Sequence, residues 1–237
     1  MSNVVDVNVS IPLFSSIVYF FFLVITLIFG SFKKWKWAFC IYLFSLMMWG
    51  FFAYLIRLRI FNESALFIHK FIVGAGFFVP VSFFIFASIF SNRPSPILNI
   101  FCIILLISIL VLDSFNLIVI RSEVNGYLLY YEMSPLYYIF YVCALFVTGM
   151  GLYKLIVQYR FSKDKLERKQ IISLIAGTSF IIIFSIIFNL FDSSVSKYSF
   201  DHIGSILNAF VIIYISIKFK FFSFNLPFRQ FANNDNN

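Results

Sequence analysis

Seven segments of the chain are each apolar over about 20 residues, the length that a helix needs to cross the hydrocarbon core of a bilayer. They span residues 11–32, 37–56, 71–90, 97–119, 136–157, 171–190 and 203–222. With 62% hydrophobic and only 12% charged residues, the chain has too little polar surface to coat a soluble globule. We therefore expect an all-α membrane protein, a bundle of seven transmembrane helices. The last span is the weakest, because Lys218 and Lys220 must reach the interface.

A basic run before the sixth span indicates how the bundle is oriented. Arg160, Lys163, Lys165, Arg168 and Lys169 precede the apolar segment that begins at Ile171. An N-terminus outside the membrane would place 13 of the 18 Lys and Arg residues in or beside inner loops. Since cytoplasmic loops carry an excess of Lys and Arg, the sequence predicts an outer N-terminus and a cytoplasmic C-terminus.

The domain organisation follows from these spans. Residues 1–10 are expected to form an extracytoplasmic tail, residues 11–222 the seven-helix domain, and residues 223–237 a short cytoplasmic tail. The first span is longer than a signal-peptide core and has neither a basic start nor a small-residue cleavage pattern. We interpret it as a retained helix.

The longest outer connection, residues 120–135, contains Asn125 and Gly126 between apolar and aromatic runs. Asn-Gly between such runs favours a two-residue turn. The sequence therefore predicts a small β-hairpin over the outer mouth of the bundle. An irregular aromatic loop at the interface is the alternative.

Polar groups near the outer ends of the spans are the candidate ligand-binding residues, because charges and amides inside a membrane are costly. They are Arg57, His69, Asp113, Asn116, Asn189 and Asn208. Their similar depth predicts an outer cavity that binds a small ligand. The alternative is that Asp113 pairs with Arg57 or with asparagines and simply holds helices together, at about 0.6 kcal/mol for each such bond.

Other classes of function find little support. The sequence has no HExxH, GxSxG or Walker motif, so we expect no enzyme. His69 and His202 are too few for a metal site, and the three cysteines lie inside apolar segments, so neither a metal nor a cofactor is expected. The net charge of +8 comes from loop cations, and nucleic-acid binding is not expected.

Several short motifs resemble a known family. Arg168, Lys169 and Gln170 lead into residues 171–176, followed by Gly177 and, near the outer end, Asn189. This pattern is similar to the N-terminal seven-transmembrane sensor region of bacterial histidine kinases. Further similar features are Trp49 and Tyr54, the start of the fifth span at Pro135, Leu136 and Tyr137, then Tyr141, Gly149 and Gly151, and the exit Lys218 to Phe222.

In that family the seventh helix runs into a cytoplasmic output domain, usually a kinase or a diguanylate cyclase. Here only 15 residues follow Phe222, without a phosphoacceptor-histidine helix. The resemblance thus implies a stand-alone sensor or receptor in a bacterial cytoplasmic membrane. It would detect a ligand or a membrane property and relay it to a separate cytoplasmic signalling protein, a kinase or cyclase.

Three alternatives remain open from the sequence. The first is a small transporter or channel, although the nearly pure Phe, Ile and Leu of the inner halves argue against an open path. The second is a structural or assembly subunit, and the last is an intramembrane enzyme. The basic run from Arg160 to Lys169 either faces a partner or lipid, or only sets the topology.

Overall fold

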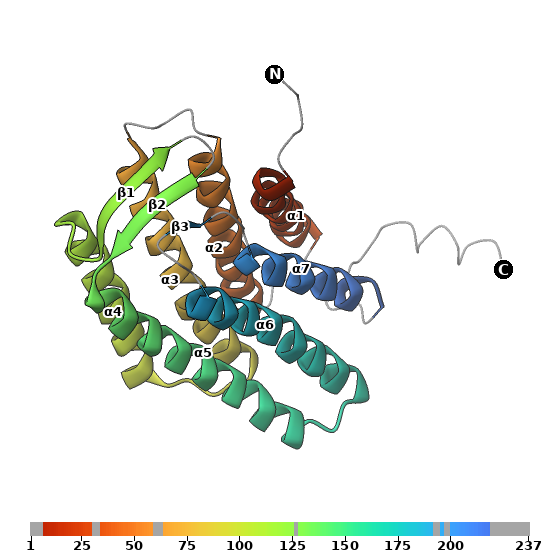
Figure 1. The fold of residues 1–237 in the computed structure, drawn as a ribbon. Helices are drawn as coiled ribbons and strands as arrows, with labels where there is room; N and C mark the ends of the chain where they lie inside the picture. The colour runs from red at the N-terminus through yellow and green to blue at the C-terminus, as the bar shows by residue number, and fades with distance from the viewer. Residues whose placement is uncertain are drawn as a thin grey trace.

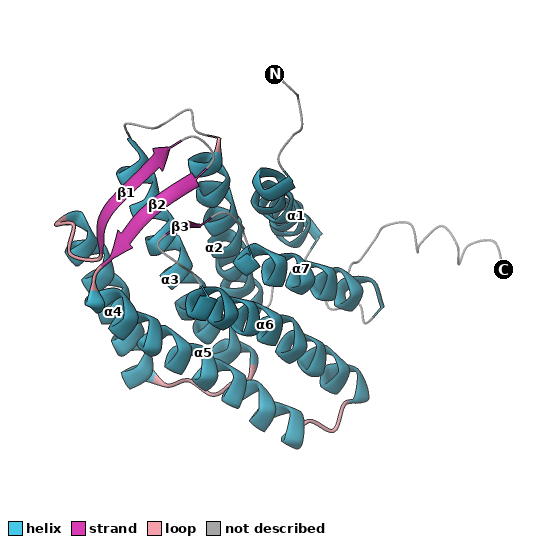
Figure 2. Cartoon of the chain, viewed as in Figure 1, coloured by secondary structure: helices cyan, strands magenta, loops and turns pink. Residues whose placement is uncertain are grey.

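The computed structural model describes residues 7–29, 34–58, 64–125, 128–191, 195–196 and 200–218. Within them lie seven helices and a three-stranded sheet (Figures 1 and 2). The helices are α1 (Val7–Phe29), α2 (Lys34–Arg57), α3 (Ala65–Phe90), α4 (Pro96–Ser114), α5 (Pro135–Phe161), α6 (Lys165–Phe191) and α7 (Phe200–Lys218). The strands are β1 (Val119–Asn125), β2 (Leu128–Met133) and β3 (Val195–Ser196).

Six of the described helices, α1 to α6, are long and apolar enough to cross a membrane. The apolar part of α7 is shorter, His202–Ser216. This agrees with the weakness of the predicted seventh span, which was expected to extend to residue 222. The described residues do not include 219–222, the predicted tail at 223–237, or Gly126 of the predicted turn. Of the N-terminal tail predicted at 1–10, they include only residues 7–10.

Helix α3 lies at the centre and contacts α2, α4, α5 and β1. Ser82, Phe83, Phe84, Phe86 and Ala87 are each almost fully buried, so nearly the whole circumference of this helix is covered by protein. A helix that is apolar all round is stable only when it is enclosed in this way. The core it forms is mainly aromatic: Phe86 lies 5.1 Å from Phe39 and 6.3 Å from Tyr42, measured between ring centroids.

Helix α4 has the opposite character, because most of its surface is exposed. Ile100, Ile103, Ile107 and Leu110 recur at helical spacing and are each more than half exposed. In a chain with this composition, such an apolar stripe is a lipid-facing surface. Its opposite face packs on α3 through Cys102, Leu105 and Ile109.

The fourth helix ends earlier than the sequence predicts, at Ser114 instead of residue 119. Asn116 adopts a left-handed conformation with φ 58°, which ends a helix. The N–H of Leu117 then bonds the carbonyl of Leu112, and the carboxylate of Asp113 accepts the N–H of Val119 at 3.1 Å. These bonds satisfy backbone groups where the chain turns from helix into strand β1.

The sheet connects two parts of the chain that are distant in sequence. Strands β1 and β2 pair in antiparallel fashion from Val119 and Met133 to Asn125 and Leu128, and β3 adds to β2. The α4–α5 connection is thereby tied to the α6–α7 connection. We call this the sheet end of the bundle, and the opposite end, which carries the α5–α6 connection, the basic end (Figure 1).

Two buried lysines connect segments of the chain at the basic end through hydrogen bonds. Lys36 is buried and donates a hydrogen bond to the carbonyl of Leu27 at 3.1 Å, which ties α2 to the last turns of α1. Lys154 is also buried and donates to the carbonyl of Arg93 and, at 2.7 Å, to Ser95 Oγ. Lys154 therefore fastens α5 to the α3–α4 connection, in addition to adding a charge at this end.

A glycine sets the spacing between α6 and α7. A Cβ atom at Gly204 would lie 2.7 Å from the carbonyl oxygen of Phe180 and 2.8 Å from Cβ of Phe184, so the two helix backbones would have to separate. We expect Gly204→Ala to lower the free energy of unfolding by about 1–3 kcal/mol. The thermal midpoint of the purified protein in mild detergent measures this.

Gly149→Ala is the matched control, since a Cβ there meets nothing within 4 Å. It should leave the midpoint unchanged or raise it slightly, because alanine favours the helix over glycine by about 0.5–1 kcal/mol. Equal midpoints for the two variants would contradict the close packing of α6 on α7.

Candidate ligand-binding cavity

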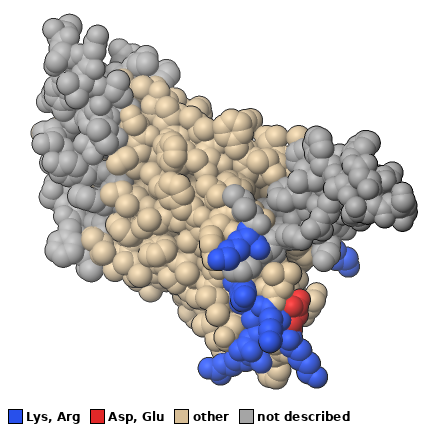
Figure 3. Space-filling model, turned by 90° about the vertical axis from the view of Figure 1, so that its right-hand side faces the viewer, with Lys and Arg blue, Asp and Glu red and all other residues tan. Residues whose placement is uncertain are grey.

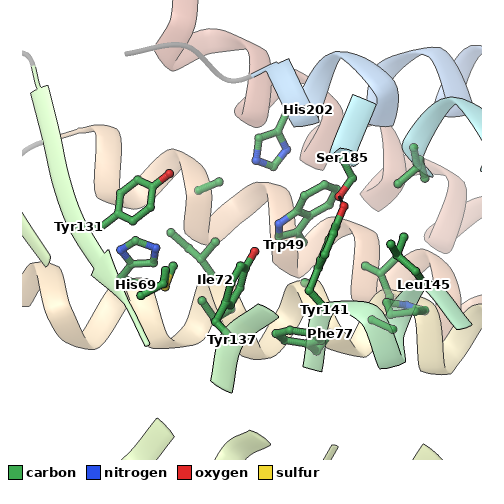
Figure 4. Close-up of a pocket in the computed structure, with 18 of the residues that line it drawn as sticks. Trp49, His69, Ile72, Phe77, Tyr131, Tyr137, Tyr141, Leu145, Ser185 and His202 are labelled. Atoms are coloured by element: carbon green, nitrogen blue, oxygen red, sulfur yellow. Dashed lines mark hydrogen bonds between the residues drawn. The ribbon is translucent and has the colours of Figure 1, made fainter. Parts of the chain in front are cut away.

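A cavity of about 750 Å³ opens at the sheet end and extends into the bundle (Figure 4). Helices α2, α3, α5 and α6 form its sides, and strands β1 and β2 form its outer wall. Along α5 the lining runs from Tyr137 to Thr148, which at 1.5 Å per residue is a depth of about 16 Å. Its volume is that of a site for a drug-sized molecule.

Among the described residues, the charged side chains that line the cavity all lie at its rim: Arg57, Arg121, Glu123 and Glu132. Their formal charges cancel. Arg121 and Glu123 form a salt bridge of 2.8 Å, and both are more than half exposed, so this pair contributes little stability. Arg57 donates to the carbonyl of Ala53 at 2.9 Å, within its own helix.

His69 joins α3 to the sheet. Its Nδ1 atom lies 2.9 Å from Ser122 Oγ, and its ring meets that of Tyr131 edge to face at 5.1 Å (Figure 4). The histidine is buried at 5% exposure. It is thus a fixed part of the wall where β1 and β2 cover the helices.

Aromatic side chains make up much of the wall below the rim. Trp49 of α2 packs against the ring of His202 at 4.6 Å, which brings the start of α7 to the cavity (Figure 4). On the opposite side, Tyr137 lies 5.9 Å from Phe77 and stacks with Tyr141 at 6.2 Å. Such surfaces offer large apolar contact areas together with hydroxyl and indole groups that can form hydrogen bonds.

One side-chain hydrogen bond spans α5 and α6 beside the cavity. The hydroxyl of Tyr141 lies 3.2 Å from Ser185 Oγ, and the two groups point toward each other (Figure 4). This contact links two helices that are joined covalently only at the basic end. A molecule in the cavity would therefore lie next to a polar contact between α5 and α6.

The floor is formed by Tyr42, Phe83, Thr148 and Thr178. Tyr42 is 1% exposed. Its hydroxyl lies close to Thr178 and Asn208, but it makes no hydrogen bond of normal geometry with the described residues. The oxygen atom is enclosed by protein, so Tyr42 lines the floor with the rest of its side chain and not with its hydroxyl.

Below the floor the bundle is closely packed. Phe39, Phe86, Leu155 and Ile171 are fully buried there, and Trp35 meets Phe90 at 5.9 Å nearer the basic end. The residues that line the cavity do not reach this region. The cavity therefore opens toward the sheet end and is closed toward the basic end.

The structure places the predicted ligand-binding residues in different parts of the bundle, and only some of them line the cavity. Arg57 and His69 line the cavity, both at its rim. Asp113 is buried beneath the first residue of β1, and Asn116 is exposed at the turn that follows α4. Neither of these two is among the lining residues.

The two remaining predicted residues lie on α6 and α7. Asn208 is buried and donates through Nδ2 to the hydroxyl of Tyr19 at 3.0 Å, while that hydroxyl donates to the carbonyl of Ser205 at 2.6 Å. This network joins α1 to α7. Asn189 is near the end of α6, and its side chain lies outside the described part of the structure, as does Asp192.

The cavity is also lined by residues that were not predicted from the sequence, chiefly Tyr42, Trp49, Tyr131, Tyr137 and Tyr141. Tyr137 and Tyr141 are four residues apart, on one face of α5. That spacing was the one sequence feature that indicated a shared aromatic face. It is not specific to a ligand site, because tyrosine is also common at membrane interfaces. Among the described residues, no group of three His, Cys, Asp or Glu side chains is placed to hold a metal ion.

Asp113 offers a direct test of its role. Asp113→Asn keeps an oxygen that can accept the N–H of Val119, whereas Asp113→Leu leaves that buried N–H without a partner. We expect the Asn variant to fold like the original protein and the Leu variant to lose about 1–3 kcal/mol of stability. Thermal midpoints in detergent compare the two. An Asn variant that keeps its midpoint but loses ligand response would instead place Asp113 in a ligand site.

Comparison with known proteins supplies the family. A family model for the N-terminal 7TM region of histidine kinase matches residues 12–226, nearly the whole chain. Comparisons with curated proteins and with solved structures gave no match. The match agrees with the resemblance seen in the motifs around Arg168, Gly177 and Asn189. The chain is a multi-pass membrane protein that belongs to the family of N-terminal seven-transmembrane regions of histidine kinases, which are membrane sensor modules.

Proposed function

We propose that this chain is a ligand-binding sensor of a bacterial cytoplasmic membrane. A small molecule binds in the cavity at the sheet end, and the resulting change in helix packing reaches a separate output protein, a kinase or cyclase, at the basic end. The sheet end faces outward and the basic end faces the cytoplasm. Arg57 and His69 are the predicted ligand-binding residues best placed to contact the molecule.

The observation that carries this proposal is the composition of the cavity wall. A molecule inside it would contact α2, α3, α5 and α6 and the strands that connect α4 to α5. A ligand changes helix packing only when it binds one packing more tightly than another. A site shared by four helices meets this condition more readily than a site on one helix, because any shift between helices changes its shape.

The distribution of charge supports the orientation. Arg160, Lys163, Lys165, Arg168 and Lys169 are exposed at the basic end. Figure 3 shows Lys and Arg gathered at one end of the molecule, with little Asp or Glu beside them. Cytoplasmic placement of this end satisfies the positive-inside rule. It also offers a cationic surface to an acidic partner or to anionic lipid.

A transporter or channel is the second candidate, and the packing below the floor disfavours it. A transport path would have to pass Phe39, Phe86 and Leu155, which are fully buried between the cavity and the basic end. If this candidate were correct, the purified chain would carry solute across liposomes. The sensor proposal predicts no such flux.

The relay can be tested with variants at the basic end. We expect the tagged full chain, purified in mild detergent from native membranes, to carry a kinase or cyclase in stoichiometric amount. Lys163→Gln combined with Lys165→Gln should reduce that recovery several-fold, because both side chains are exposed in the basic surface. Quantitative mass spectrometry of the purified samples measures the ratio.

Lys34→Gln is the matched control, since Lys34 is also exposed at the basic end but belongs to α2. It should leave recovery of the output protein unchanged. Recovery of the chain alone, from membranes known to contain such kinases and cyclases, would contradict the relay.

A further inference from the structure

The chemistry of the cavity below its rim narrows the class of ligand, given the ligand-binding function proposed above. Within the described part of the chain, no charged residue lines the cavity below Arg57 and the sheet. The walls are formed by residues such as Trp49, Phe77, Tyr137 and Leu145. An ionised group placed there would lose its hydration without gaining a counter-ion, which is strongly unfavourable.

The described residues of the rim do not supply a net charge either. Arg121 is already paired with Glu123 at 2.8 Å, and Arg57 and Glu132 contribute one formal charge of each sign. A ligand of either sign would therefore meet a like charge as well as an opposite one. An uncharged molecule is not repelled by either charge at the rim and has no ionic hydration to lose below it.

The wall adds neutral hydrogen-bonding groups. Tyr141 and Trp49 line the cavity and carry a hydroxyl and an indole N–H. A phenolic hydroxyl both donates and accepts hydrogen bonds, and an indole N–H donates one. A ligand with a hydroxyl, carbonyl or similar neutral group can therefore form a hydrogen bond in an otherwise apolar site.

We propose that the cavity binds an uncharged, elongated and mainly apolar molecule with one neutral hydrogen-bonding group, which meets the hydroxyl and indole groups of the aromatic wall. Its body lies along the aromatic wall between α5 and α2, over a depth of about 16 Å. Molecules of this kind dissolve in the bilayer, so the sensor reports on a lipid-soluble signal instead of an ion or a sugar.

The test uses photolabelling of the full chain in phosphatidylcholine vesicles. The probe is a long-chain primary alcohol that carries an alkyl diazirine, and its matched partners are the corresponding alkane and alkyl sulfate. Mass spectrometry maps the labelled residues. We expect the alcohol to label cavity residues such as Leu145 and Ile182 about three- to tenfold more than the alkane does, as one added hydrogen bond would give. The sulfate should not label them.

Variants of lining residues test whether the labelling takes place in the cavity. Gly76→Leu adds a side chain to the cavity lining beside Trp49, where a Cβ would lie 3.5 Å from the indole nitrogen, and should reduce labelling about tenfold or more. Gly149→Leu, on the open face of α5, should not reduce it. Leu145→Trp also adds a large side chain to the lining of the cavity. It is the second test variant if Gly76→Leu does not fold. Trp49→Phe combined with Tyr141→Phe should bring the alcohol down to the level of the alkane.

Two results would overturn the proposal in distinguishable ways. Labelling of the cavity by the sulfate at least as strongly as by the alcohol would reject the uncharged ligand but leave ligand binding at this site intact. Equal labelling of the original protein, Gly76→Leu and Leu145→Trp by every probe would remove the cavity as a binding site, and with it the proposed function.

Discussion

The packing of α3 determines what the rest of the bundle can do. Its aromatic and aliphatic side chains cover nearly its full circumference, so it is stable only when α2, α4, α5 and β1 surround it. Near the basic end Phe86 is fully buried and packs against both Phe39 and Phe90. Toward the sheet end the same helices diverge around Trp49, Phe77 and Tyr137, and the cavity occupies the space between them.

The sheet is the second element on which the cavity depends. In a bilayer the backbone must satisfy its own hydrogen bonds, and irregular segments are tolerated only where protein or water covers them. Pairing of β1 with β2 and of β2 with β3 meets this need for two connections at once. The bond between His69 and Ser122, and that from the N–H of Val119 to Asp113, then hold the sheet on the helices.

The sequence predicted the helical membrane class and the family well, because long apolar runs and short basic motifs carry that information locally. It predicted the site less completely. The buried charge of Asp113 looks like a ligand group in sequence, and only the left-handed turn at Asn116 brings the N–H of Val119 within its reach. Conversely, Tyr42 looks like any aromatic residue in a span, and its role depends on which helices face it.

An uncharged molecule in the cavity should alter helix packing at the basic end. Spin labels at Lys34 and Lys163, both exposed there, measure it directly once Cys40, Cys102 and Cys143 are replaced by alanine. In lipid nanodiscs, adding a long-chain alcohol should shift the electron–electron distance distribution between the labels by several ångströms. The Gly76→Leu variant should show no shift. An unchanged distribution in the original protein, under conditions where the alcohol occupies the cavity, would contradict the account.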